Sequence, residues 1–317
     1  MIKVVNPNVE IWKQEGYTLD AIWKHIARCA RVCYQSVPRN NGETDYGFLV
    51  RTLLKRINVG NQHYDNEKIK TCHLSVFEHG TVHLKYRLFM VKDITKVNRF
   101  IHNPYSKVKE DDGYAYVTTN MRVLIENNWL DELEFIDTTP NCPYYTDRYT
   151  VNFITDIGAS RELNRHRVNS ISEESTRYCR YNADKFGNNI TVAKLPWIPY
   201  VDNDSGHDYT NGFYNDDEIY YDGIIRDKYA VNWNAIDWFL YGLQIANLVY
   251  CKCIELGWTA QQAREILPLN TKTQVVHTAF IDDWKHWIDL RSDEVSGKVH
   301  PMMKELADKL VKLINNK

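Results

Sequence analysis

Two segments of this sequence alternate apolar and polar side chains with a period of two residues. Residues 82–91 read VHLKYRLFMV, and residues 147–155 read DRYTVNFIT. Successive side chains of a β-strand point to opposite faces, so this alternation is typical of a strand with one covered face. Antiparallel sheets contain such half-buried strands. The two segments therefore predict an antiparallel sheet, in which they could pair although a long segment separates them.

Helical spacing of apolar residues appears on both sides of these strands. Residues 18–34 show it, with Thr18 as the expected N-cap. Further helices are predicted in the C-terminal third, at residues 233–257, 259–268, 277–291 and 301–314. Thr259 and Gln262 form an expected capping box, and Pro301 falls in a first helical turn.

The remaining segments set the domain organisation. Residues 103–114 are typical of a loop, and residues 118–133 of a helix. Residues 201–223 are acidic and rich in Tyr and Gly, which indicates a surface excursion or flap. No internal repeat and no Gly/Ser linker divides the sequence. We therefore expect an α+β fold, as a single domain over residues 1–317 with a central antiparallel sheet flanked by helices.

Composition excludes several classes of protein. With 44% hydrophobic residues, 25% charged residues and a net charge of −2, the chain is expected to be soluble and globular, without the basic excess of a nucleic-acid coat protein. It has no apolar run that could cross a bilayer, and its first residues lack the pattern of a signal peptide. The seven cysteines are odd in number and irregular in spacing, so we expect reduced thiols, a cytoplasmic location and no metal site.

The most polar stretch of the chain is RHRVNSISEESTRY, residues 165–178. We expect a short helix that carries Glu162 and Arg165 on one face, together with His166. An extended segment would then point Glu173 and Ser175 the same way, together with Arg177. Arginine binds phosphate bidentately, and Glu and Ser can bind amide edges or a ribose, so the pattern suits a ligand with phosphates and a polar ring. A salt-bridged surface is the alternative interpretation.

The RHR triplet, followed some seven residues later by Ser, resembles the signature of the flavin-dependent thymidylate synthases. Four further blocks of the sequence are similar to motifs of that family and follow its order: IARCARVCYQS, HLSVFEHGTVHL, QQAREILPLNTKT and WKHWIDLR. The resemblance implies reductive methylation of dUMP to dTMP, with 5,10-methylenetetrahydrofolate as carbon donor, FAD as cofactor and NADPH as reductant. It also implies a homotetramer with shared sites. Relative to compact members, residues 91–146 and 201–224 are insertions.

The resemblance also implies roles for individual residues. The FAD site would comprise His79, Thr81, Arg165, His166, Arg167, Glu173, Phe280 and His286. The dUMP site would comprise Glu162, Arg165, Glu173, Glu174, Ser175, Thr176, Arg177, Arg264 and Arg291. Arg264 would reach the nucleotide of a neighbouring subunit. Arg291 would act in catalysis, because a guanidinium beside the uracil ring stabilises its negative charge. Glu162 stands where many relatives have Gln, and a carboxylate near phosphate would repel it unless an arginine intervenes.

Three other functions remain open at this point. A phosphate- or nucleic-acid-binding module could use the arginine strip, although such a module should show a wider basic face. A DNA strand-exchange enzyme built on Arg, His and Tyr would need a second arginine at position 169, which is Asn169. A relative that binds flavin without activity would match the same motifs. Bound flavin is yellow, so the visible spectrum separates the first two functions from the synthase.

Overall fold

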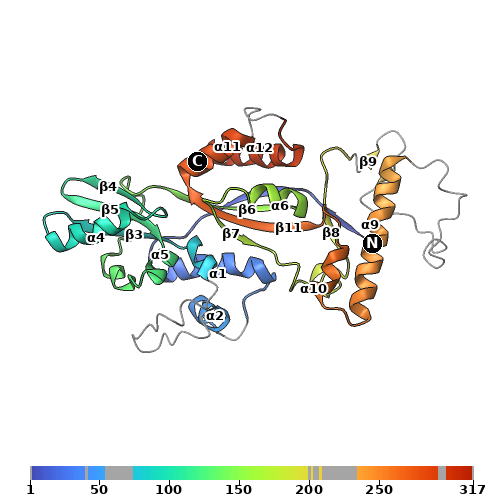
Figure 1. Cartoon of the computed structure of the whole chain (residues 1–317), viewed down its shortest axis with the longest axis horizontal. Helices are drawn as coiled ribbons and strands as arrows, with labels where there is room; N and C mark the ends of the chain where they lie inside the picture. Colours follow the sequence, from blue (N-terminus) through green and yellow to red (C-terminus); the bar gives the residue numbers. More distant parts are fainter. Residues whose placement is uncertain are drawn as a thin grey trace, which may run out of the picture.

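A four-stranded antiparallel sheet forms the centre of the molecule. The computed structural model describes residues 2–39, 42–53, 74–198, 201–202, 207–208, 234–291 and 298–315. The strands of this sheet are β2 (Asn8–Trp12), β6 (Arg148–Asp156), β11 (Lys272–Phe280) and β7 (Ser170–Glu173). They lie in the order β2-β6-β11-β7, and every neighbouring pair is antiparallel (Figure 1). The predicted central antiparallel sheet is confirmed.

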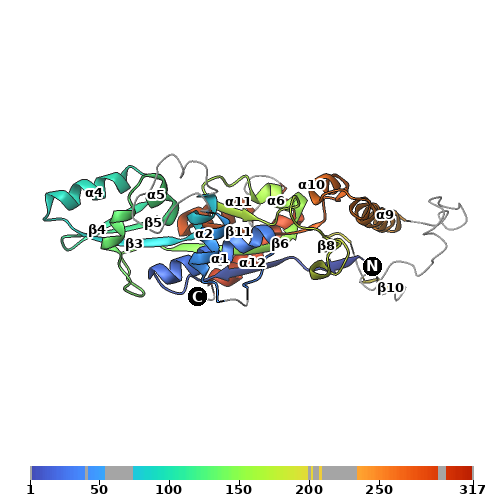
Figure 2. The ribbon, with the colours of Figure 1, turned by 90° about the horizontal axis from the view of Figure 1, so that it is seen from below.

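Helices cover both faces of this sheet. On one face lie α1 (Leu19–Tyr34) and the 3₁₀ helix η1 (Leu74–His79), and on the other lie α6 (Ile157–Leu163), α11 (Ile281–Arg291) and α12 (Pro301–Asn315) (Figures 1 and 2). Trp284 and Trp287 of α11 are fully buried in the core beneath the second face. On the first face, Cys29 and Val32 of α1 pack with Trp12.

Strand β11 was not predicted from the sequence. Residues 277–280 were assigned to a helix, whereas in the structure they end β11, and α11 begins at Ile281. The strand lies between β6 and β7, so both of its edges are paired, and helices α1, α6 and α11 cover its two faces. Its last six residues, from Val275 to Phe280, are all buried. A strand buried on both faces shows no polar alternation, which removes the sequence signal.

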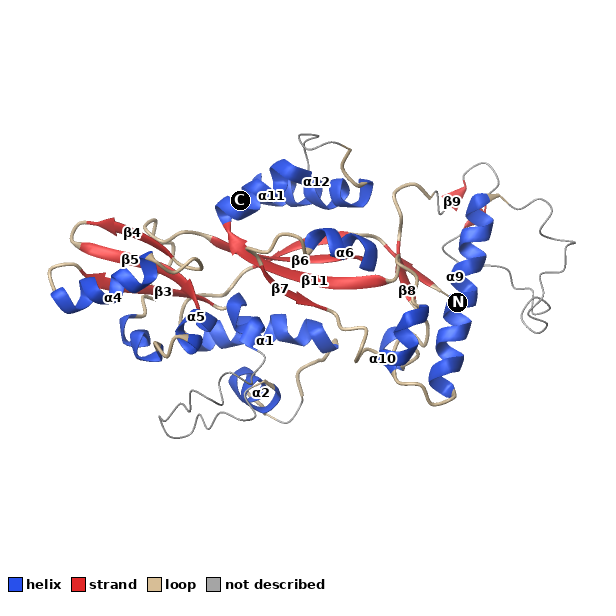
Figure 3. Ribbon diagram, viewed as in Figure 1, coloured by secondary structure: helices blue, strands red, loops and turns tan. Residues whose placement is uncertain are grey.

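A second, three-stranded sheet is built mostly from residues 91–146. Its strands are β3 (Thr81–Arg87), β5 (Tyr114–Asn120) and β4 (Lys107–Asp111), in the order β3-β5-β4 (Figure 3). The helices α4 (Val91–Ile101), α5 (Met121–Glu126) and η2 (Leu130–Phe135) lie with it. The sheet has a hydrophobic core of its own, to which α1 and η1 also contribute.

This second sheet corrects three expectations. Strand β3 pairs with β5 and not with β6, so the two alternating segments lie in different sheets. The expected loop at 103–114 contains β4, and the expected helix at 118–133 is divided among the end of β5, α5 and η2. Asp112 and Gly113 connect β4 to β5 with φ angles of 43° and 75°. Asp-Gly at such a turn is a strong hairpin signal, which the charged neighbouring residues obscured.

Apart from α2, which packs against α1, the remaining elements lie toward the end of the elongated molecule opposite the second sheet (Figure 2). They are β1 (Lys3–Val5), which pairs in parallel with β8 (Thr191–Ala193), the hairpin of β9 (Val201–Asp202) and β10 (His207–Asp208), α2 (Asp45–Thr52), η3 (Asp184–Phe186), α9 (Ala235–Glu255), α10 (Ala260–Ala263) and η4 (Arg264–Ile266). The predicted caps at Thr18 and at Thr259 with Gln262 are confirmed. The predicted flap at 201–223 lies largely outside the described residues.

The described part of the chain also bears on the cysteine and membrane predictions. Its six cysteines are free, and Cys72 lies outside the described residues. Among those residues we find no cluster of His, Cys, Asp and Glu that could hold a metal ion. No described helix is long and apolar enough to cross a membrane.

Candidate active site

Helix α6 brings the signature triplet to the edge of the central sheet. Asp156 ends β6 and caps α6, because its carboxylate accepts a hydrogen bond of 2.6 Å from the Ala159 N–H. The helix ends at Leu163, so Arg165 and His166 follow it rather than lying on it as predicted. Arg165 is nevertheless close to Glu162, because its Nη1 lies 3.1 Å from Oε1 of Glu162.

Glu162 joins two arginines that are distant in the sequence. Its Oε1 contacts Arg165, and its Oε2 lies 3.1 Å from Nη1 of Arg291, the last residue of α11. The Arg165 side chain is 71% exposed, whereas that of Arg291 is 17% exposed. The expected repulsion between Glu162 and a phosphate is therefore offset by two guanidinium groups. An anion that replaced the carboxylate would meet both of them.

The other two members of the triplet differ in exposure. His166 is half-buried, and its Nε2 has no hydrogen-bond partner in the described chain. Burial and the positive charge of Arg291 lower the pKa of His166 to about 4, so the ring is neutral at pH 7 and can accept or donate a hydrogen bond. Arg167 is exposed and makes no ion pair with a described residue. The triplet thus offers unpaired donors beside the Glu162 cluster.

The strip after the triplet is shorter than predicted. Strand β7 ends at Glu173, so Glu173, Ser175 and Arg177 do not share one direction. Glu173 accepts hydrogen bonds from Asn164 (2.9 Å) and Thr273 (3.1 Å). Ser175 starts a turn, and its N–H donates to the carbonyl of Cys33 in α1.

The neighbours of this strip point in several directions. Glu174 is buried, where it accepts hydrogen bonds from Lys272 (2.6 Å) and Tyr181 (3.1 Å). Thr176 is half-buried. Arg177 is exposed and donates to Gln261 of α10, the helix that leads into η4 and Arg264. Arg264 itself is half-buried and pairs with Glu265 at 3.3 Å.

The residues predicted for the flavin side lie on both sides of the sheet. His79 is fully buried between the sheet and α1, and both of its ring nitrogens contact hydroxyl groups. Thr81 is buried and accepts from Arg148 (3.1 Å), and Phe280 is buried with its ring 5.4 Å from the same guanidinium. His286 of α11 is exposed and lies with His166, on the Arg291 side. The structure therefore does not bring the whole flavin set together within one chain.

Three polar residues beside the site were missed from the sequence. Asn164 and Asn169 contact the two ring nitrogens of the fully buried His277, at 3.4 and 3.2 Å. Asn164 also holds Glu173, so this network connects the triplet to β7 and β11. From the sequence, Asn169 stands out only because a DNA strand-exchange enzyme would have an arginine there. His277 belongs to β11, which the sequence does not indicate.

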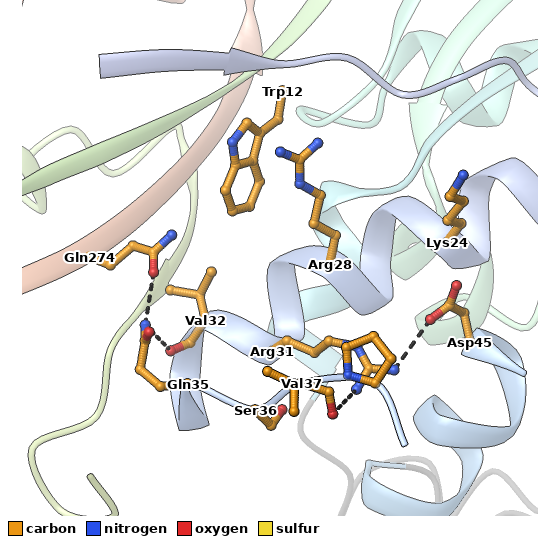
Figure 4. A pocket seen from close by; sticks show the side chains of 11 residues that line it. Trp12, Lys24, Arg28, Arg31, Val32, Gln35, Ser36, Val37, Asp45 and Gln274 are labelled. Carbon is orange, nitrogen blue, oxygen red and sulfur yellow. Dashed lines mark hydrogen bonds and ion pairs between the residues drawn. The ribbon is translucent and has the colours of Figure 1, made fainter. Parts of the chain in front are cut away.

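A cavity of about 430 Å³ lies between α1 and the sheet, away from these residues (Figure 4). The Arg28 guanidinium lies 3.9 Å from the Trp12 ring centroid, and Gln35 bonds to Gln274 at 2.8 Å. None of the predicted site residues lines this cavity.

Comparison with known proteins places the chain in a family. Residues 145–317, more than half of the chain, match the model of Thy1, described as thymidylate synthase complementing protein. No curated protein sequence matches. The crystal structure of a UMP/dUMP methylase PolB from Streptomyces cacaoi bound with 5-Br dUMP aligns with a TM-score of 0.41 at 14% identity, over 99% of this chain and 93% of that chain. The form bound with 5-Br UMP gives a TM-score of 0.39 at 15% identity, over 99% and 92%. On the family match, which includes α6, the triplet and Arg291, the chain belongs to the Thy1 family of thymidylate synthase complementing proteins.

Proposed function

We propose that this protein is a flavin-dependent thymidylate synthase, which methylates dUMP to dTMP. The carbon donor is 5,10-methylenetetrahydrofolate, FAD is the cofactor and NADPH is the reductant. Membership of the Thy1 family of thymidylate synthase complementing proteins supports dTMP as the product. The observation that carries the proposal is the cluster in which Glu162 pairs with both Arg165 of the signature triplet and Arg291 of α11.

Arg291 has the features of a group that stabilises charge on a pyrimidine. It is mostly buried, so its field is screened less than that of a surface arginine. Its Nε is buried and has no partner in the described chain, which leaves a donor available. A guanidinium beside the uracil ring favours the ionised ring and makes C5 more nucleophilic. Glu162 keeps this side chain in place before the nucleotide binds.

The exposed residues of the triplet fit the phosphate groups of dUMP and FAD. Arg165 and Arg167 are exposed cations, and His166 has an unpaired Nε2, which is a donor set suited to a pyrophosphate. These three residues would hold FAD, with His286 beside them. When bound, FAD supplies the hydride chemistry. In the proposed homotetramer the sites are shared: Arg264 reaches the nucleotide of a neighbour, and Glu173, Ser175, Thr176 and Arg177 form the rest of the dUMP strip. The Glu174 side chain is buried against Lys272 and Tyr181, so it holds the strip in place rather than facing the nucleotide.

The test is the Arg291→Lys variant, with Arg161→Lys on the exposed face of the neighbouring α6 as control. Lysine keeps the charge but loses the planar fork. Flavin absorbance and NADPH-driven flavin reduction should persist, because neither needs an activated uracil. Formation of dTMP should fall by roughly 10²–10³, as for loss of a preorganised charge. The control should match the parent.

Two results would count against the proposal. If dTMP formation by Arg291→Lys stays within about threefold of the parent, a change of only ~0.7 kcal/mol, Arg291 is a helix-end cation and the activating group lies elsewhere. If the purified parent has no flavin spectrum and forms no dTMP with all substrates present, the assigned reaction is wrong.

A further inference from the structure

A cavity of about 460 Å³ lies where the second sheet adjoins the central sheet (Figure 3). Its walls come from the end of β2, the segment before α1, the starts of β3 and β6, and the loop that precedes β6. Of the residues predicted for FAD and dUMP, only Thr81 lines it. Sites for small organic ligands have volumes in this range, so the cavity is a second candidate site, separate from the proposed active site.

Arg148 brings a positive charge to this cavity without a carboxylate in contact. It is the first residue of β6 and is half-buried. Its Nη1 donates to the Thr81 hydroxyl and its Nη2 to the carbonyl of Glu78, both at 3.1 Å, and both acceptors are neutral. Among the described residues it makes no ion pair, and its Nε is buried without a hydrogen-bond partner. Two of its five N–H groups are used, so the rest can serve a ligand.

The guanidinium of Arg148 keeps its charge in this place. Burial lowers the pKa of Arg148 to about 10, while the carboxylates of Glu78 and Asp283 act in the opposite direction, so the side chain is protonated at pH 7. Removing a charge from water is costly unless a counter-charge in contact offsets the cost. A carboxylate would supply that counter-charge with the best geometry, because its two oxygens accept parallel hydrogen bonds from the planar fork of arginine.

The other charges of the cavity favour a ligand with a single negative charge. The charged residues that line it balance, with Lys13 and Arg148 against Glu15 and Asp147. Glu15 pairs with Lys24 at 2.6 Å, whereas Asp147 is exposed beside Arg148. A dianion such as phosphate would meet Asp147 as well as Arg148, and the two negative groups would repel each other. The cavity therefore suits a monocarboxylate better than a phosphate.

A stack of three aromatic rings gives the cavity a flat wall. His83 lies between Tyr17 and Tyr145, with ring centroids 3.7 and 3.9 Å away and interplanar angles of 22° and 7°. Tyr145 also contacts Tyr116 edge-on at 5.5 Å and donates to Asp137 at 2.7 Å. Tyr17 is half-buried and contacts no further ring in the part of the chain that the structure describes. A planar ring of a ligand can therefore extend the stack at Tyr17.

Two buried imidazoles add neutral hydrogen-bonding groups to this wall. Burial lowers the pKa of His25 to about 4 and that of His83 to about 3, and Arg148 acts in the same direction on both. Both rings are therefore neutral at pH 7, and each carries one N–H donor. Nδ1 of His83 is buried and has no hydrogen-bond partner among the described residues. Such an atom calls for a partner that the chain itself does not provide.

We propose that this cavity binds an organic monocarboxylate with a planar ring, whose carboxylate pairs with Arg148 and whose ring stacks on Tyr17. In the alternative interpretation, Arg148 only ties β6 to η1 through the carbonyl of Glu78, and water fills the cavity. The proposed site goes beyond the proposed function and does not depend on it, since it requires no formation of dTMP.

The probes are 2-naphthoate, a planar monocarboxylate, and 2-naphthamide, which has nearly the same shape without the charge. In calorimetric titrations of the purified protein, 2-naphthoate should bind at least about tenfold more tightly than 2-naphthamide, because only the carboxylate pairs with Arg148. Inorganic phosphate should bind more weakly than 2-naphthoate. Equal affinity for the two naphthalene probes, or tighter binding of phosphate, would contradict the ligand class. A Kd weaker than about 1 mM for 2-naphthoate would mean that the cavity holds water only.

Variants test the two anchors separately. Arg148→Gln should weaken binding of 2-naphthoate by roughly tenfold to a hundredfold and change that of 2-naphthamide little. Arg87→Gln, at an exposed arginine of β3 outside the cavity, is the matched control and should equal the parent. If Arg148→Gln does not fold, Tyr17→Leu carries the test, and loss of its ring should weaken 2-naphthoate by roughly threefold to tenfold. Unchanged affinity in the folded variant would overturn the proposal.

The position of the bound ring is measured by NMR in protein labelled with ¹⁵N-histidine. 2-Naphthoate should shift the resonances of His25 and His83, which line the cavity, whereas the exposed His102 at the end of α4 should not move. Saturating dUMP should not displace the probe. Shifts at His102 alone, or displacement by dUMP, would place the probe elsewhere and overturn the site. If the protein forms no dTMP, the proposed function fails on its own, and these titrations still decide whether the carboxylate site exists.

Discussion

The two faces of the central sheet both bury histidines, but the partners of those histidines differ. Beneath α1, His25 and His79 bond to hydroxyl groups alone. Beneath α6 and α11, His277 bonds to two asparagines, and the ion pair between Glu162 and Arg291 lies at the rim of the same layer. The backbone of β11 is common to both faces, since Thr278 points to the first and His277 to the second.

This difference shows how burial decides which chemistry a polar layer can support. A fully buried ionisable group loses its charge unless a partner offsets the desolvation, so the buried rings of His25 and His79 are neutral at pH 7. At the rim, solvent reaches Glu162, which is 26% exposed, and charges persist as pairs. The half-exposed cluster of charges at the rim suits an anionic substrate.

A lower pH should have the largest effect on the free energy of unfolding, and the buried histidines of both faces should contribute to it. The pKa is lowered to about 4 for His25 and to about 3 for His277, and it is well below its ordinary value for His79. The unfolded chain takes up these protons near pH 6.5 and the folded chain does not. Stability is therefore full above about pH 6.5 and falls as the pH falls below it, by up to ~1.4 kcal/mol per pH unit for each histidine.

Urea unfolding between pH 7.5 and 5 measures this slope. Three such histidines give on the order of 4 kcal/mol per pH unit, enough to unfold a domain of ordinary stability near pH 5. His25→Asn and His277→Asn should each reduce the slope by the contribution of one histidine, although the two residues lie on opposite faces. A flat profile from pH 7 to 5.5 would show that the buried rings accept protons in the folded state.

The sequence reveals some of these features and conceals others for physical reasons. The caps at Thr18 and Thr259 are local, because each side chain bonds to a backbone N–H within three residues. The bond between Glu162 and Arg291 spans 129 residues, so no local pattern indicates it. The motif order was enough to identify the family. The hydrogen bonds of His79 to Thr278 and Ser172 were not visible, because they depend on the register of β11, which carries no alternation.

A smaller effect is expected from His277→Leu on the α6 face. Leucine leaves Oδ1 of Asn164 and Nδ2 of Asn169 without their partner, and an unsatisfied buried polar group costs about 1–3 kcal/mol. We expect a loss of roughly 2–4 kcal/mol in the free energy of unfolding, together with weaker dUMP binding, because Asn164 also holds Glu173. His277→Gln keeps one donor and one acceptor and should lose less. Equal stability of the leucine variant and the parent would mean that the asparagines find other partners.

The smallest effect should come from Arg165→Ala, and it sharpens the comparison within the charged face. Arg165 and Arg291 approach Glu162 at the same distance of 3.1 Å, but their side chains are 71% and 17% exposed. An exposed pair contributes little, because water screens it and the side chains lose entropy, so Arg165→Ala should change the free energy of unfolding by less than ~0.5 kcal/mol. Arg291→Ala should cost more, about 1–3 kcal/mol, since Glu162 then keeps only its exposed partner and α11 loses packing at its end.

Affinity for dUMP should fall in both variants, measured by titration beside urea unfolding. If Arg165→Ala destabilises the fold as much as Arg291→Ala does, Arg165 is held as part of the structure. A loss of affinity without a loss of stability would instead show that Arg165 is kept at the surface for the ligand.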